Sequence, residues 1–393
     1  MKTFITYYHK SRESAKTGAH KLYFRLLDKL SSSHRIILIS PSNPYSGRET
    51  IDHYRIQPTK FRSNLLPNSF VTGFSIIKQI RSLLPKIEKE SIFAAYSFGM
   101  SNVYPLLYLQ KKLDISCFLS LHSDPFKYIF FKLEESGMKI LPRVEVNVKL
   151  LNKIYYEIFK KINCFSLGRI DNLFVLSDFH REALAKKCKG LHRGNIHVQP
   201  NNIPKRSLNF PFSNRMELDS EEFKLVFVGS LIPRKGVKFL IQAVAKLSDK
   251  FNYRLKIIGD GESRERLERL VREKELQDCI AFMGYVDNPI PHIAKSDCLV
   301  LPSIAEAFPL TILEAMGVNT PVIGTKTGAV PDIIGEEKYL VKAKSPGELK
   351  GKIENLLKPS NYKEAKEYFN ERKEEFIFDW EETFVSTIFD IIE

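Results

Sequence analysis

The chain contains 393 residues, 43% of them hydrophobic, and carries a formal net charge of +14 at pH 7. This length suits two domains of roughly 200 residues each, and the ordinary apolar content excludes disordered and fibrous proteins. No run reaches the roughly 18 uncharged apolar residues that a membrane-spanning helix needs.

The positive charge is concentrated in the first half of the chain. Residues 1–200 hold 32 Lys and Arg against 15 Asp and Glu, a balance of +17, whereas residues 201–393 hold 28 against 31, a balance of −3. This asymmetry indicates that the first half faces an anionic partner, such as membrane lipid, a lipid-diphosphate acceptor or nucleic acid. A well-solvated basic surface is the alternative.

The first half alternates short β-branched or aromatic runs with amphipathic stretches. The first apolar stretch is too short for the core of a signal peptide and is better interpreted as a strand. Strands are predicted at Thr3–Tyr8, Arg35–Ser40, Phe93–Ser97, Ile115–Leu121, Asn172–Leu176 and Ile196–Gln199. Helices are predicted at Ala19–Leu30 and Asp178–Cys188. Such alternation is typical of a parallel sheet with helices on both faces.

Residues 125–165 depart from this alternation. They interleave aromatic side chains such as Phe126, Tyr128 and Phe159 with basic ones such as Lys127 and Lys160. This pattern can form an element that lies on a membrane surface. Ordinary packing within the domain explains the same aromatics.

The five cysteines are odd in number, scattered, and contain no Cys-x-x-Cys pair: Cys117, Cys164, Cys188, Cys279 and Cys298. We therefore expect reduced thiols in a cytosolic protein, and neither a disulfide framework nor a structural zinc site.

A second alternating pattern follows a break in periodicity. The segment from Pro200 to Glu222 contains Pro, Ser and Asn and is interpreted as a linker. Strands are then predicted at Leu225–Val228, Leu255–Ile258, Ile280–Phe282, Cys298–Leu301, Pro321–Gly324 and Tyr339–Val341. Helices are predicted at Val237–Leu247, Ser263–Lys274 and Leu310–Met316. The simplest α/β architecture is two Rossmann-like domains with a cleft between them, where ligands bind outside the carboxyl ends of the strands.

The strand Leu225–Val228 ends in the loop Gly229–Gly236, and a helix follows. A glycine turn lets the backbone approach a ligand, and the helix start offers unpaired N–H groups. Arg234 and Lys235 add positive charge, so the loop suits a diphosphate. The segment lacks the glycine and Lys-Ser/Thr spacing of a P-loop, and two basic residues in a loop are often simply solvated.

The strand Cys298–Leu301 is followed by two glutamates eight positions apart, Glu306 in a loop and Glu314 in a helix. Pro309 fits the first helical turn, so N–H groups near Leu310 can face a phosphate. Glu306 can reach sugar hydroxyls and Glu314 ribose hydroxyls. The alternative is one glutamate stabilised by the helix dipole and one that is solvated.

The ordered set of motifs in the second half resembles the family-four retaining glycosyltransferases of GT-B fold. These motifs are Phe227-Val-Gly-Ser-Leu-x3-Lys-Gly236, Ile258-Gly-Asp-Gly261, Met283-Gly-Tyr-Val286, Leu301-Pro-Ser303, Glu306-x7-Glu314, Pro321-Val and Gly328-Ala-Val-Pro-Asp332. The resemblance is dense in the second half and thin in the first.

The resemblance implies a domain plan. Residues 1–203 would be an acceptor-side Rossmann-like domain, 204–220 a linker, and 221–370 a nucleotide-sugar-binding Rossmann-like domain facing the first across a cleft. Residues 371–393 would be a C-terminal helix that packs back on the first domain. Trp380 of that helix is expected to be structural.

The resemblance also implies roles in binding the donor. Lys235 would contact the diphosphate, and Arg234 would stand in for an arginine that the family often has where this chain has Ser230. Glu306 would hold the donor sugar and Glu314 the ribose. The other donor-binding positions that it implies are Gly229, Tyr285, Val286, Ala307, Phe308, Pro309 and Leu310.

In the first half, the resemblance points to two positions. Gly18 would lie in the loop between the first strand and first helix, where the family commonly has two glycines. His122 would follow the fourth predicted strand and contact the donor sugar near the reacting carbon, in a catalytic set with Glu306 and Lys235. A structural or solvated histidine is the alternative.

The implied reaction is transfer of a hexose or N-acetylhexosamine from a nucleotide-diphosphate sugar, with retention, to a hydroxyl of a glycan or lipid-linked acceptor in cell-surface polysaccharide synthesis. No Asp-x-Asp is present, so we expect no metal and no cofactor. We expect a cytoplasmic protein, peripheral at the inner face of an anionic membrane, that binds no nucleic acid. A GT-B-fold nucleotide-sugar epimerase and an inactive transferase-like binding protein remain alternatives.

Overall fold

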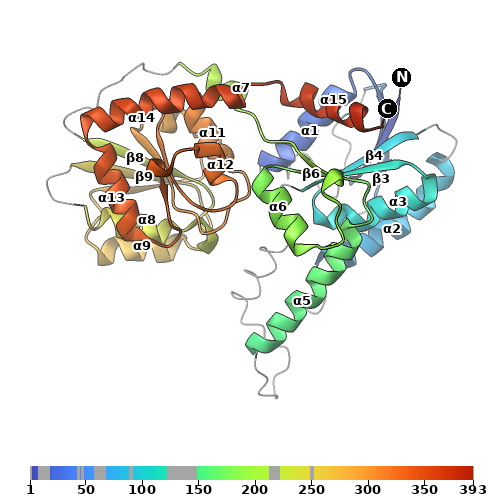
Figure 1. Cartoon of the computed structure of the whole chain (residues 1–393), viewed down its shortest axis with the longest axis horizontal. Helices are drawn as coiled ribbons and strands as arrows, with labels where there is room; N and C mark the ends of the chain where they lie inside the picture. Colours follow the sequence, from blue (N-terminus) through green and yellow to red (C-terminus); the bar gives the residue numbers. More distant parts are fainter. Residues whose placement is uncertain are drawn as a thin grey trace. The chain divides into compact units, whose positions relative to one another are not determined.

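A computed structural model of the chain describes residues 2–7, 18–41, 45, 48–56, 68–87, 92–121, 148–211, 222–247 and 252–392. The chain divides into two compact units (Figure 1). The first contains Met1–Pro200 and Asp379–Glu393, and the second contains Asn201–Phe378.

The first unit is built around a parallel sheet of seven strands in the order β3-β2-β1-β4-β5-β6-β7. The strands are β1 (Thr3–Tyr7), β2 (Arg35–Ser40), β3 (Ile51–Arg55), β4 (Ile92–Phe98), β5 (Ser116–Leu121), β6 (Asn172–Val175) and β7 (Ile196–Val198). The helices are α1 (Gly18–Leu30), α2 (Asn68–Ile87), α3 (Val103–Leu113), α5 (Val148–Leu167), α6 (Asp178–Lys187) and α15 (Trp380–Ile392), with short 3₁₀ turns at Met100–Asn102 and Arg193–Asn195.

Both faces of this sheet are buried, as the central strand β1 illustrates. Ile5 and Tyr7 belong to a core cluster that also contains side chains of α2 and α3. Thr6, between them, has its hydroxyl 2.7 Å from the hydroxyl of Tyr23 on α1. Because successive side chains of a strand point to opposite faces, helices cover both faces of the sheet. The predicted parallel sheet with two helical layers is confirmed.

The C-terminal helix α15 belongs to the first unit, as the sequence predicted. Phe384 is buried between the ring of Trp380, with centroids 5.0 Å apart, and the ring of Phe174 on β6, at 4.6 Å. Ion pairs join Glu381 to Arg25 of α1 and Glu382 to Lys29 of the same helix. The Lys29–Glu382 pair is exposed and contributes little. Arg25 and Glu381 are 35% and 13% exposed, so this pair adds to the buried rings in holding α15 in place.

The second unit contains a parallel sheet of six strands in the order β10-β9-β8-β11-β12-β13. The strands are β8 (Phe223–Val228), β9 (Tyr253–Ile258), β10 (Ile280–Gly284), β11 (Cys298–Leu301), β12 (Val322–Thr325) and β13 (Leu340–Val341). The helices are α7 (Lys205–Leu208), α8 (Val237–Val244), α9 (Arg264–Glu273), α10 (Ile290–Ala294), α11 (Leu310–Gly317), α12 (Val330–Ile334), α13 (Pro346–Leu356) and α14 (Pro359–Arg372), with 3₁₀ turns at Pro233–Lys235, Glu337–Tyr339 and Lys373–Phe376.

Three details differ from what the sequence suggested. β3 was not predicted, because this edge strand has the polar sequence Ile-Asp-His-Tyr-Arg and pairs on one side only. Residues 205–208, placed in a linker, form α7 and belong to the second unit. The C-terminal segment that belongs to the first unit begins at Asp379 rather than at residue 371.

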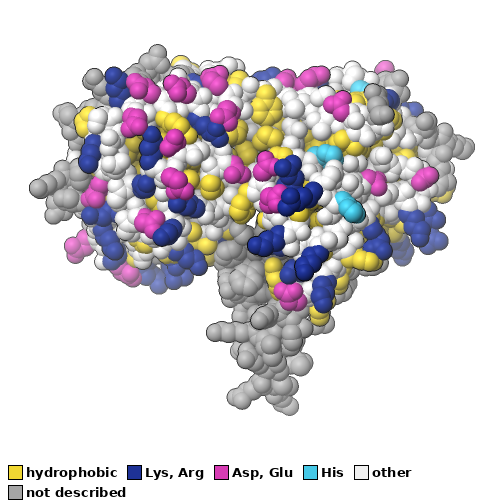
Figure 2. All heavy atoms as spheres, in the orientation of Figure 1, with side chains coloured by type: hydrophobic (Ala, Val, Ile, Leu, Met, Phe, Trp, Pro, Cys, Tyr) yellow, Lys and Arg dark blue, Asp and Glu magenta, His cyan; other side chains and the backbone are white. Residues whose placement is uncertain are grey.

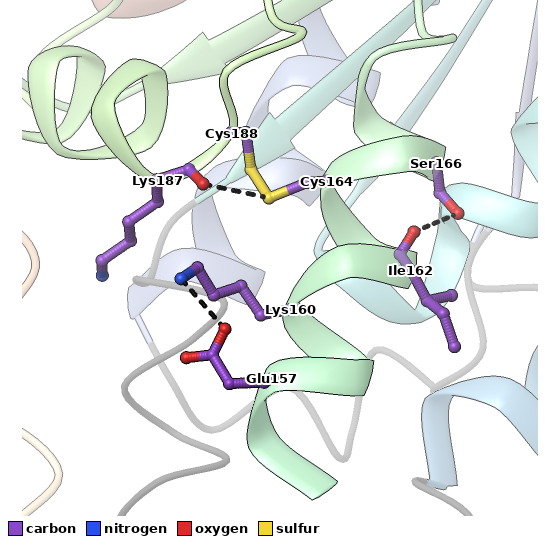
Figure 3. Close-up of a disulfide and its surroundings, with 7 residues drawn as sticks. All are labelled: Glu157, Lys160, Ile162, Cys164, Ser166, Lys187 and Cys188. Carbon is purple, nitrogen blue, oxygen red and sulfur yellow. Dashed lines mark hydrogen bonds and ion pairs between the residues drawn. A yellow bond between two sulfur atoms is a disulfide. The ribbon is translucent and has the colours of Figure 1, made fainter. Parts of the chain in front are cut away.

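The expectation that all cysteines are reduced is wrong for one pair. Cys164 near the end of α5 and Cys188 directly after α6 form a disulfide, with Cα atoms 5.0 Å apart (Figure 3). The 24-residue separation carries no short motif, and only the packing of the two helices brings the thiols within bonding geometry. Cys117, Cys279 and Cys298 are free thiols.

Two remaining features concern the membrane. The basic and aromatic stretch 125–165 is described only from residue 148, where it forms α5. No helix among the described residues is long and apolar enough to cross a bilayer.

Candidate functional site

The connection order of the second sheet marks where a ligand would bind. From β8 the chain passes to β9 and β10 on one side, and β11, β12 and β13 then fill the other side. In open α/β sheets the crevice for ligands lies at the carboxyl ends of the strands where the order reverses. The loops after β8 and β11 flank this point, and they are the two loops that the sequence selected.

Two glycines allow the loops after β8, β11 and β12 to pack with backbone against backbone. Gly236 has φ +66°, and a Cβ atom added there would lie 2.1 Å from the carbonyl oxygen of Pro302. Gly328, in the loop after β12, has φ +59° and would place a Cβ atom 2.0 Å from the carbonyl oxygen of Glu306. The N–H of Ile304 also donates to the carbonyl of Arg234 at 2.7 Å. The loops after β8 and β11 are therefore fixed against each other.

Lys235 and Glu306 meet at the contact of these loops. Lys235 Nζ lies 2.5 Å from Glu306 Oε1, and the Ser303 hydroxyl donates to the same oxygen at 2.7 Å. Arg234 Nη1 lies 3.9 Å from Glu306 Oε2 and also donates to the carbonyl of Ala305 at 3.2 Å. The Glu306 side chain is only 6% exposed, so its charge needs these cations and the hydroxyl as partners. The structure thus pairs a residue predicted for the diphosphate with one predicted for the sugar.

Helix α11 begins beside this pair. Pro309 is its N-cap residue and provides no side-chain hydrogen bond to the first turn, so the positive end of the helix dipole can act on an anion. Phe308 is buried and packs against Phe376, with ring centroids 6.4 Å apart, whereas Ala307 and Leu310 are half-buried. The predicted segment therefore places the start of α11 four residues after Glu306, with Phe308 buried beneath it.

Glu314 lies further along α11 and is 7% exposed at its side chain. Its Oε1 accepts a hydrogen bond from Arg206 Nη2 of α7. Arg206 was not among the predicted residues, because it lies 108 positions from Glu314 in a segment interpreted as a linker.

The other predicted positions fall into two groups. Gly229 is half-buried, Ser230 and Tyr285 are exposed, and Val286 is half-buried, and each follows a strand end of the second sheet. In the first unit, Gly18 is the first residue of α1, and His122, directly after β5, lies outside the described residues. Within the described part of the chain, no group of three or more His, Cys, Asp and Glu residues is placed to hold a metal ion.

Known proteins are similar to this chain mainly in its second unit. Residues 211–376 match the family model described as glycosyl transferases group 1. An uncharacterized glycosyltransferase of Methanocaldococcus jannaschii is 31% identical over 157 residues, 39% of this chain and 40% of that protein. The N-acetyl-alpha-D-glucosaminyl L-malate synthase of Bacillus anthracis is 29% identical over 164 residues, 41% of this chain and 42% of that protein. The alignments thus span about two fifths of each relative.

Solved structures extend the similarity to the fold of the whole chain. Sucrose-phosphate synthase of Thermosynechococcus elongatus superposes with a TM-score of 0.74 at 17% identity, and the match covers 100% of this chain and 99% of that one. With its two parallel sheets layered by helices, the chain has the GT-B fold.

Proposed function

Starting from the match of residues 211–376 to the family model of glycosyl transferases group 1 and from the GT-B fold, we propose that this protein is a retaining glycosyltransferase. It transfers a hexose or an N-acetylhexosamine from a nucleotide-diphosphate sugar to a hydroxyl of a glycan or lipid-linked acceptor in cell-surface polysaccharide synthesis. The observation that carries the proposal is the fixed contact of the loops after β8 and β11, which sets Lys235 beside Glu306 at the switch point of the sheet.

The proposed donor position follows from the charges at this contact. The diphosphate lies against Lys235, Arg234 and the start of α11, where the lysine exchanges part of its interaction with Glu306 for the phosphate oxygens. Glu306 then accepts hydrogen bonds from hydroxyls of the donor sugar, and Glu314 accepts them from the ribose. Tyr285 and Val286 lie beside the base, and His122 contacts the sugar near its anomeric carbon.

The proposed reaction needs positioning more than a protein nucleophile. The bond between the anomeric carbon and the diphosphate breaks, and the acceptor oxygen bonds to that carbon on the same face. The acceptor proton passes to the departing diphosphate. Lys235, Arg234 and the helix start stabilise the negative charge that develops there. We propose that these charges act without a metal ion.

The reaction is tested with a panel of nucleotide sugars and simple glycan acceptors, with the anomeric configuration of the product determined by NMR. Retained configuration and a rate unchanged by EDTA support the proposal. An inverted product contradicts the retaining mechanism, and a rate that EDTA abolishes and Mg²⁺ or Mn²⁺ restores contradicts the metal-free step. Conversion of the donor to its epimer without an acceptor identifies an epimerase, and binding without turnover identifies an inactive relative.

We further propose that the first unit docks on an anionic membrane, which would bring a lipid-linked acceptor to the enzyme. Ile158 and Phe165 of α5 and Phe179 of α6 are 51%, 65% and 44% exposed. Lys and Arg side chains lie over α6 and beside α5 on the face that Figure 2 shows. Exposed rings with basic neighbours are favourable at a lipid surface.

Flotation with vesicles that contain phosphatidylglycerol tests the docking. The proposal predicts binding at low salt that weakens when Phe165 is replaced by Ser. Met283→Ser is the matched control, because Met283 is also exposed, at 42%, but lies in the second unit. No flotation at low salt contradicts this part of the proposal.

A further inference from the structure

The contact between Arg206 and Glu314 is more than a surface ion pair. Arg206 Nη2 donates to Glu314 Oε1, and the two side chains are 45% and 7% exposed. A carboxylate that is this buried loses most of its hydration, so the cation beside it determines how its charge is compensated. The Arg206 side chain remains partly in solvent.

Helix α7 packs closely against α11 at Gly317. A Cβ atom at Gly317, the last residue of α11, would lie 2.6 Å from Cβ of Ser207 and 2.8 Å from Cγ2 of Ile203. Ser207 and Ile203 are 0% and 1% exposed. Only a glycine at this position leaves room for α7, so the backbone that carries Arg206 lies directly on the helix that carries Glu314.

The segment before α7 is fixed as well. The N–H of Ile203 donates to the carbonyl of Phe376 at 2.9 Å, and Asn202 Nδ2 donates to the carbonyl of Phe378 at 2.8 Å. These bonds restrain the approach to α7, while the contact with Gly317 restrains the helix itself. The fold therefore delivers the guanidinium of Arg206 to Glu314 at little cost in conformational entropy.

We propose that Arg206 is a positioning residue for the nucleotide ribose, acting through Glu314. The proposal rests on the donor site proposed above. Arg206 bonds to one carboxylate oxygen and fixes its orientation, while a carboxylate has about four lone-pair sites and can accept ribose hydroxyls together with the guanidinium. Because an ionised acceptor forms stronger hydrogen bonds than a neutral one, the pairing sharpens discrimination between ribose and deoxyribose.

The test is calorimetric titration of the full chain with a nucleoside diphosphate and with its 2′-deoxy and 3′-deoxy forms, using the base that binds most tightly in a panel. For the wild type, we expect loss of the hydroxyl that contacts Glu314 to weaken binding roughly tenfold or more, because a hydrogen bond to a charged group is lost. We call the loss of affinity on removal of this hydroxyl the deoxy penalty. Glu314→Gln and Arg206→Ala should each weaken binding of the ribonucleotide and reduce the deoxy penalty to about twofold or less.

Three variants separate positioning from other roles. Arg206→Lys should recover part of the deoxy penalty, since it restores a cation. Arg206→Gln removes the charge but keeps a long polar side chain, and it replaces Arg206→Ala if the alanine variant unfolds. Lys205→Ala removes the same charge from the same helix and should keep the full penalty.

Three results would overturn the inference. If the wild type binds ribonucleotides and the deoxy penalty is unchanged in Arg206→Ala and Arg206→Gln, Arg206 does not position Glu314 and the donor site stands without it. The same titrations with the nucleoside monophosphate give the preference for diphosphate. If the deoxy penalty is unchanged in the Arg206 variants but they lose the preference of the wild type for the diphosphate, Arg206 contacts phosphate instead. A wild type that binds no nucleotide in the panel overturns the donor site and this inference together.

Discussion

The two units use glycine differently after their central strands. In the first unit, Gly99 follows β4 with φ +82°, and a Cβ atom added there would meet nothing within 4 Å. In the second unit, Gly236 follows β8 with φ +66°, and the added atom would lie 2.1 Å from the carbonyl oxygen of Pro302. One glycine serves a turn conformation alone, whereas the other also lets two loops touch.

Side-chain packing and backbone packing also place different demands on the sequence. The first unit relies on interlocking side chains, such as the rings of Phe174, Trp380 and Phe384 between the sheet and α15. At the strand ends of the second unit, backbone packs on backbone. Many side-chain sets can fill an interior of given volume, but a backbone contact this close admits only glycine. The glycine motifs therefore lie where the backbone makes the contact, which is also where the candidate site lies.

The largest expected effect tests the side-chain part of this comparison. Phe384→Ala should lower the free energy of unfolding of the first unit by about 4 kcal/mol, because it leaves a cavity between β6 and α15. Hydrogen exchange, read separately for each unit, measures the change. Ser386→Ala, exposed on the same helix, is the control and should change stability by less than about 0.5 kcal/mol. Equal losses from both variants would show that α15 is not held by its rings.

The next effect tests the close backbone contact at Gly236. Gly236→Ala should destabilise the second unit by about 3 kcal/mol, since it adds steric overlap with Pro302 to the strain of a positive φ. Gly99→Ala meets only the strain of a backbone conformation that is almost restricted to glycine, with φ +82° and ψ 159°, and should cost about 2 kcal/mol in the first unit. Urea unfolding with probes in each unit gives both values. If the two substitutions cost the same, the close contact of the loops is not important to the fold.

The disulfide provides a third comparison, because the only bridge among the described residues lies in the first unit. Reduction of Cys164–Cys188 should lower the stability of that unit by roughly 3 kcal/mol, as expected for a closed loop of this length. Thermal unfolding with and without a reductant measures the loss. A variant with both cysteines replaced by serine should show no response to the reductant. A response that persists there would assign the effect to another thiol.

The smallest effect is a pH dependence of the stability of the first unit. Burial lowers the pKa of His197 on the edge strand β7 below its ordinary value of 6.5. The unfolded chain therefore binds more protons than the folded one as the pH falls below about 6.5, and stability decreases with it. His197→Gln, which keeps a polar partner for Asn172, should flatten the stability profile between pH 7 and 5. An unchanged slope would exclude His197 as its source.

The sequence predicted most strands and the motif-bearing loops because both depend on local patterns. β8 and β11 are runs of apolar residues, and their following loops carry glycines whose role is steric. It could not predict β3, whose polar residues match an exposed edge, or the pairing of Cys164 with Cys188, which depends on how α5 and α6 pack. Arg206 was missed for the same reason, since its contact with Glu314 joins segments far apart in the chain.

The most direct test of the proposed site compares two neighbouring lysines. Lys235 contacts Glu306 between the two loops, whereas Lys238 is exposed on α8 with its ammonium 4.8 Å from the ring of Phe239. Titration of nucleotide-diphosphate sugars into Lys235→Ala and Lys238→Ala measures how each affects donor affinity. We predict that the first substitution weakens binding by roughly 10- to 100-fold, as loss of a charged contact to phosphate requires, and that the second leaves it unchanged. Equal affinity in both variants would contradict a donor site at the contact of these loops.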